Sequence, residues 1–84
     1  MNEREQLITQ RILKTLEELD GGSIAENLLF ARVALNMVPR LLIAEFEARL
    51  KLCEAKKWIV GLAGIAGMNK WAITDDGRIA LTQL

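Results

Sequence analysis

The residues that could carry chemistry in this chain are few, and they form no familiar catalytic set. Asp75 and Asp76 are a carboxylate pair that could serve acid–base work or hold a metal. Adjacent residues at the start of a helix diverge, however, and the positive end of the helix dipole explains both carboxylates. Cys53 is the only cysteine, there is no histidine or tyrosine, and no serine lies in a nucleophile elbow. The sequence therefore argues against an enzyme and predicts no metal and no other cofactor.

Three glycines invite comparison with phosphate-binding loops. Gly61, Gly64 and Gly67 recur at every third position. The spacing matches neither the dinucleotide-binding fingerprint nor the phosphate loop with its lysine and its serine or threonine. We interpret these glycines as positions that let a short apolar hairpin twist and turn.

Nucleic-acid binding is the chemistry that the basic residues could support. The chain has 11 basic and 11 acidic residues and a formal net charge of zero, so the whole molecule offers no long-range field to a polyanion. Two interpretations stay open: a local patch that contacts phosphates, or a solvated face whose charges pair within one helix. The pairs of the second interpretation would be Glu45 with Arg49 and Glu47 with Lys51. The candidate phosphate contacts are Arg40, Arg49, Lys51, Lys56 and Lys70.

Apolar periodicity predicts helices that would position these residues. Spacings of three and four predict an amphipathic helix over residues 3–19, closed by the glycine at position 21. Ser23 is expected to cap a second helix. That helix should stop near Asn36, because Pro39 biases the residue before it away from helical geometry.

The second helix is apolar on most of its circumference. One face carries Ile24, Leu28, Ala31 and Leu35, and another carries Phe30, Val33, Ala34 and Met37. A small three-helix domain can hardly enclose both faces, so we weigh a self-association surface against burial within the chain, partly by the first helix. The candidate partner or dimer surface is Phe30, Val33 and Met37.

A third helix is expected to begin within residues 40–43. Its predicted inward stripe is Leu42, Phe46, Leu50 and Cys53. That stripe leaves Ile43, Ala44, Glu47, Ala48 and Lys51 on the outward side. Leu42, at the start of the helix, is counted on both sides. Of these outward residues, only Lys51 is a natural contact for a phosphate or a base.

After the third helix the pattern changes to a period of two, which predicts a hairpin. Residues 58–63 form its first strand, 64–69 the turn and 70–74 the returning strand. Trp58 and Trp71 would then face each other, either as a cross-strand core pair or as a base-stacking platform. Residue 74, a threonine, is placed to cap a short last helix.

The end of the third helix reads LCEAKKWIVGL and the end of the chain reads ITDDGRIAL. With the order helix, helix, helix, hairpin, these segments resemble winged helix-turn-helix domains of bacterial transcription regulators. The resemblance spans nearly the whole chain. It implies an α+β, mainly α fold in one domain over residues 1–84, namely a three-helix bundle, an antiparallel β-hairpin wing and a short C-terminal helix. It also implies a DNA-binding regulator that acts as a dimer, with the third helix at the major groove of double-stranded DNA.

The sequence departs from that pattern where a regulator reads DNA. The outward side of the third helix is mostly apolar or acidic, and the wing has no basic residue between Lys57 and Lys70. A second function class therefore stays open: a non-catalytic protein-interaction or assembly module on a winged-helix scaffold that does not bind DNA, with a homodimer or another protein as its partner.

Composition bounds the setting of the protein. It is 51% hydrophobic and 26% charged, which leaves apolar surface for a partner. The first ten residues lack the apolar core of a signal peptide, and the longest uncharged run, residues 58–69, is too short to span a bilayer as a helix. We expect no membrane partner and a cytoplasmic location, where Cys53 would stay reduced and buried.

Overall fold

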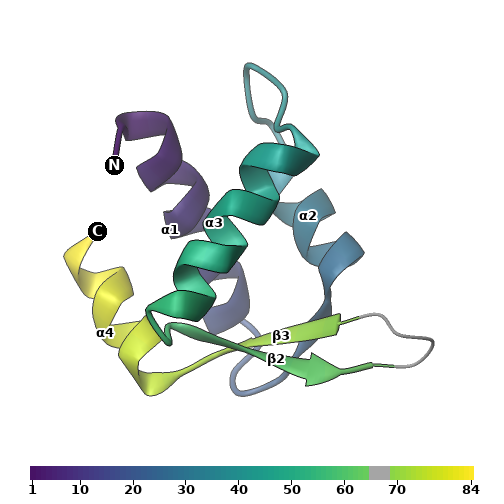
Figure 1. The fold of residues 1–84 in the computed structure, drawn as a ribbon, viewed down its shortest axis with the longest axis vertical. Helices are drawn as coiled ribbons and strands as arrows, with labels where there is room; N and C mark the ends of the chain where they lie inside the picture. The colour runs from purple at the N-terminus through teal and green to yellow at the C-terminus, as the bar shows by residue number, and fades with distance from the viewer. Residues whose placement is uncertain (65–68) are drawn as a thin grey trace.

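The computed structural model describes residues 1–64 and 69–84 and shows an α+β fold that is mainly helical (Figure 1). Three strands form one antiparallel sheet in the order β1-β3-β2. This arrangement is compatible with a winged helix. The predicted turn at 64–69, including Gly67, lies largely outside the described residues. The elements are α1 (Glu3–Glu17), β1 (Ile24–Ala25), α2 (Glu26–Ala34), α3 (Ile43–Ala55), β2 (Ile59–Ala63), β3 (Asn69–Ile73) and α4 (Asp75–Gln83).

The first helix, α1, is the element against which the others pack. It contacts α2, α3, α4 and β3, and Figure 1 shows it behind α3. It begins with a capping box, in which the Asn2 side chain accepts from the Glu5 amide and the Glu5 side chain accepts from the Asn2 amide. It ends at Glu17, two residues before the expected end, and Gly21 then takes a φ of 87°, a conformation that favours glycine. Its fully buried apolar residues are Ile8, Ile12, Leu13 and Leu16.

The start of the second helix differs from the prediction. Ile24 and Ala25 form the short strand β1, paired with Trp71 and Lys70 of β3. The helix α2 therefore starts at Glu26, and Ala25 is its N-cap residue without a side-chain hydrogen bond. The predicted Ser23 cap is wrong, because pairing with β3 holds the residues after Ser23 in extended geometry.

The structure decides which apolar face of α2 lies inward. Val33 is 0% and Met37 8% exposed, and Phe30 is half-buried with its ring edge-on to Phe46 at a centroid distance of 5.2 Å. These three residues were the predicted partner surface, and instead they contribute to the core of a single chain. On the opposite predicted face Leu28 is 55% and Leu35 65% exposed, whereas Ile24 is buried in β1.

The third helix begins at Ile43, at the end of the expected range. Phe46, Leu50 and Cys53 are buried as predicted. Leu42 is 58% exposed and so does not belong to the inward stripe. It is the extended N-cap residue of α3, and the buried side chain at this point of the chain is that of Leu41.

The hairpin is present, but its register separates the two tryptophans. Ile59 pairs with Ile73, and Trp71 therefore lies opposite Gly61. A side chain at position 61 would press on the Trp71 ring, since a Cβ there would lie 3.2 Å from it. Trp58 precedes β2, and its carbonyl accepts from the Thr74 amide at 3.0 Å. The expectation that the two tryptophans face each other is wrong, because the aligned register brings Thr74 to Trp58.

The last helix begins as the sequence predicts. The Thr74 hydroxyl accepts from the Gly77 amide at 3.0 Å and donates to the Lys57 carbonyl at 2.6 Å. Gly77 lies so close to the hairpin that a Cβ on it would be 2.1 Å from the Trp58 carbonyl oxygen. The last helix therefore packs closely against the hairpin.

Candidate functional site

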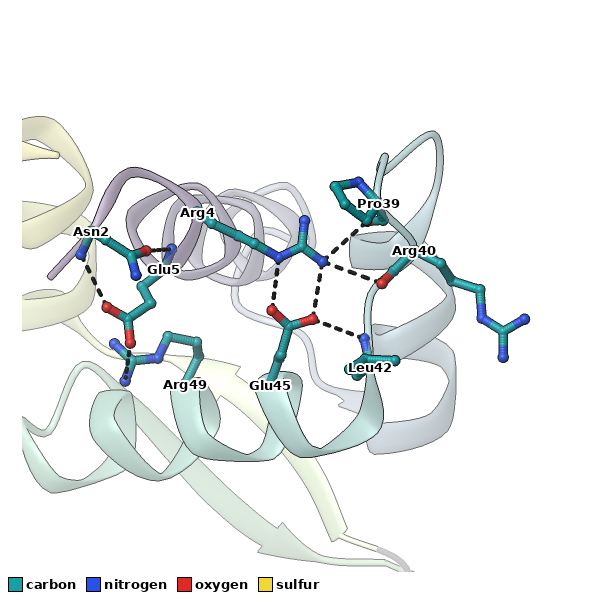
Figure 2. A network of polar contacts seen from close by, with 8 residues as sticks. All are labelled: Asn2, Arg4, Glu5, Pro39, Arg40, Leu42, Glu45 and Arg49. Carbon is teal, nitrogen blue, oxygen red and sulfur yellow. Dashed lines mark hydrogen bonds and ion pairs between the residues drawn. The ribbon is translucent and has the colours of Figure 1, made fainter.

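The densest polar cluster joins α1 to the beginning of α3 (Figure 2). The Arg4 guanidinium donates from Nε to Glu45 Oε2 at 2.7 Å and from Nη2 to Glu45 Oε1 at 3.0 Å. The same Nη2 donates to the carbonyls of Pro39 and Arg40 at 3.0 and 3.2 Å. Hydrogen bonds from Arg4 and from the Leu42 amide lower the pKa of Glu45 to about 2. With these groups engaged in each other, the cluster anchors α3 rather than offering a reactive group.

A second ion pair joins the same two helices. Arg49 Nη2 lies 3.5 Å from Glu5 Oε2, and the hydrogen bond from the Asn2 amide is the main cause that lowers the pKa of Glu5 (Figure 2). The predicted pairing of Glu45 with Arg49 within α3 is therefore wrong. Both residues face α1, which supplies a partner of the opposite charge to each of them.

The five candidate phosphate contacts lie on different regions of the molecule. Arg49 is engaged with Glu5, whereas Arg40 is exposed in the loop before α3. Lys56 follows the other end of α3, with its Nζ 5.4 Å from the centroid of the Trp58 ring. The two ends of a 13-residue helix are about 20 Å apart.

The remaining two cations point to different sides. Lys51 is exposed on α3, beside Glu47 and Glu54. Lys70 lies opposite Leu62 in the sheet. Its side chain lies on the other face of the sheet from that of its neighbour Trp71, which is buried. The structure therefore does not bring the five cations together into one patch.

A groove lies between α2, α3 and β3. It consists of two adjoining hollows, with volumes of about 370 Å³ and about 340 Å³. Glu26, Glu47 and Asn69 line both hollows. The larger hollow adds Asn27, Phe30, Ile43 and Phe46, and the smaller hollow adds Leu50, Lys51, Glu54 and Trp71.

Charge and fixed geometry distinguish this groove. Glu26, Glu47 and Glu54 line it, and Lys51 is the only cation among its described lining residues. The Trp71 indole donates from Nε1 to Glu26 Oε1 at 3.0 Å, which holds that carboxylate at the groove wall. Within residues 1–64 and 69–84, no ion pair joins Glu47 to Lys51, so the second predicted intrahelical pair is also wrong.

Exposed apolar side chains mark two surfaces. Leu28 and Leu35 mark the outward face of α2, and Val38 is exposed in the loop after it. Val60 and Leu62 are partly exposed on one face of the β2–β3 hairpin. The spacing of Leu28, Ala31 and Leu35 signalled an apolar face, but periodicity alone could not show that it lies outward.

The described residues contain no group of three or more metal-ligating side chains. Cys53 is buried, and the loss of solvation raises the pKa of its thiol to about 11, which keeps it protonated at neutral pH. Asp75 and Asp76 are exposed at the start of α4, where Asp75 pairs with Arg78 at 3.2 Å. Among the described helices, none is long and apolar enough to cross a membrane.

Comparisons with known proteins add no further constraint. No family model matches the chain, and no curated protein is significantly similar to it.

Proposed function

We propose that this chain is a non-catalytic protein-interaction module built on a winged-helix scaffold. The observation that supports this most directly is the composition of the groove beside α3, where three carboxylates meet one lysine. A helix that reads DNA in the major groove needs hydrogen-bond donors and cations on this side. Here the exposed face of α3 offers glutamates, apolar side chains and a single lysine, Lys51.

The contact surface of this module is the outward face of α2 with the loop that follows it. Leu28, Leu35 and Val38 are exposed there, and Val38 is 92% exposed. Exposed apolar residues that cluster on one face mark protein-interaction sites more often than scattered ones do. This surface replaces the one predicted from the sequence, whose residues are buried or half-buried in one chain.

DNA binding by a dimeric transcription regulator is the competing proposal. It draws support from the order of the helices and the hairpin, and from Lys56 and Lys57 at the end of α3. It lacks a converging basic surface, which supplies most of the affinity of a protein for duplex DNA.

A titration with a generic DNA duplex at about 50 mM salt separates the two proposals. We expect no saturable binding and no difference between the wild type and Lys51→Glu. Binding that weakens steeply with salt and is lost in Lys51→Glu would overturn the interaction module in favour of a DNA-binding domain.

A second measurement locates the proposed contact surface. Leu28→Asp combined with Leu35→Asp should abolish self-association, or binding to an identified partner, while the fold measured by circular dichroism is retained. The matched control is Ile79→Asp on α4, which is 57% exposed and lies outside this surface. An equal loss in the control would show that the α2 face is not the contact.

A further inference from the structure

We infer that the groove between α2, α3 and β3 binds a positively charged segment of a partner protein, which inserts an apolar side chain between Phe30 and Ile43. The inference rests on the proposed function as an interaction module and assigns a second contact surface with its own chemistry. This groove is separate from the outward α2 face, so the two surfaces can be tested independently.

The larger hollow of the groove has an apolar part that is open to a partner. Phe30 and Phe46 meet edge to face, at an interplanar angle of 79°, and line this hollow together with Ile43. Ile43 is 63% exposed although it lies beside these aromatic rings. At about 370 Å³ the hollow is near the lower end of small-ligand pockets, which suits one or two inserted side chains rather than a whole helix.

The carboxylates along the groove select the charge of the occupant. Glu47 and Glu54 are seven residues apart on α3, so they lie on the same side of the helix at a separation of about 10 Å. Glu26 stands at the opposite wall, held by the Trp71 indole. With Lys51 as the only described cation, the groove carries a formal surplus of negative charge.

This charge pattern predicts the spacing of basic residues in the partner. Cations about 10 Å apart on one face occur at i and i+7 of a helix. Ile43 precedes Glu47 by one turn of α3, so an apolar residue about one turn beyond the cation that meets Glu47, on the side away from Glu54, would reach the hollow. A nucleic acid does not fit, because its phosphates would meet the three glutamates.

The test uses the whole chain labelled with ¹⁵N and the two tryptophan indole resonances. The probe is a 14-residue amphipathic peptide of leucine and lysine, and the matched probe replaces each lysine with glutamate. The Trp71 indole N–H should shift in a saturable way with the lysine peptide, since it bonds to Glu26 in the groove. The Trp58 indole, next to Lys56, should stay in place.

Charge and shape variants make the test specific. Glu47→Lys should weaken binding of the lysine peptide roughly tenfold, whereas Glu18→Lys makes the same charge change on exposed Glu18 at the end of α1 and should alter it less than about twofold. Ile43→Ser should also weaken binding, and Ile79→Ser, which truncates a similarly exposed isoleucine on α4, should not.

Three results would overturn the inference. One is an unmoved Trp71 indole. Another is an equal response to the glutamate peptide, or a loss of binding in Glu18→Lys as large as that in Glu47→Lys. The third is self-association of the wild type that Glu47→Lys abolishes, which would make a second copy of this chain the occupant. Any of these would leave the outward α2 surface, tested by its own variants, unaffected.

Discussion

Gly77→Ala is expected to destabilise the protein, although alanine is the better helix former. Gly77 lies in the first turn of α4, where the change to alanine would by propensity alone add up to about 1 kcal/mol. The structure opposes this gain. A Cβ at position 77 would lie 2.1 Å from the Trp58 carbonyl oxygen and 2.7 Å from Ile73 Cγ1, both inside any normal contact distance.

The clash cannot be relieved without loss. The Trp58 carbonyl accepts from the Thr74 amide at 3.0 Å, so moving α4 away from Trp58 stretches that hydrogen bond. Overpacking costs about 1–3 kcal/mol and a lost hydrogen bond about 0.5–1.5 kcal/mol. After subtracting the propensity gain, we expect a net loss of about 2 kcal/mol, which lowers Tm by roughly 8–16 °C in a domain of this size.

Thermal unfolding followed by circular dichroism, with urea unfolding as a second measure, tests this expectation. The control is Gln83→Ala, which changes an exposed residue of the same helix and should alter the free energy of unfolding by less than about 0.5 kcal/mol. A Gly77→Ala protein as stable as the wild type, or more stable, would refute the close packing of α4 on the hairpin.

Three further predictions concern the polar and buried groups. Glu45 has a pKa of about 2 in the folded protein against an ordinary value of 4.5, so its stabilising effect is complete above pH 4.5 and is lost as the pH falls toward 2. Glu45→Gln should therefore lower Tm at pH 7, and the difference from the wild type should shrink in acid; a constant difference from pH 7 to pH 2 would contradict the role of its contact with Arg4. Thr74→Ala should cost about 1 kcal/mol in urea unfolding through the lost cap, and Thr74→Ser should restore most of it, whereas equal losses would show that the hydroxyl is not the cap. Cys53 should resist alkylation at pH 8 in the native protein and react fully in denaturant, and rapid labelling of the native state would show that it is not buried.

Features of the fold that depend on neighbouring residues could be predicted from the sequence. The cap at Thr74 follows from residues within one turn of each other and is confirmed. The buried stripe of α3 follows from helical periodicity and is confirmed at Phe46, Leu50 and Cys53. Such local patterns act at short range, so the rest of the chain does not alter them.

Features that depend on segments far apart in the chain could not be predicted in this way. Glu45 and Arg49 have the right spacing to pair within α3. Instead, Glu45 pairs with Arg4 and Arg49 pairs with Glu5, because α1 places these two residues beside them. From the sequence, Ile24 and Ala25 look like the start of a helix. They are extended instead because β3, more than 40 residues away, supplies their hydrogen-bond partners. In each case two arrangements satisfy the local pattern, and the distant partner selects one.

Propensity and periodicity were enough to predict the helices and the β2–β3 hairpin in their order, the ends set by glycine and threonine, and the apolar stripes, but not the strand β1. Tertiary packing alone decided which stripe of α2 faces outward, because both are apolar and only the position of α1 and of Phe46 distinguishes them. It also decided that three glutamates from α2 and α3 line one groove, since residues distant in the chain can be brought together only by the fold.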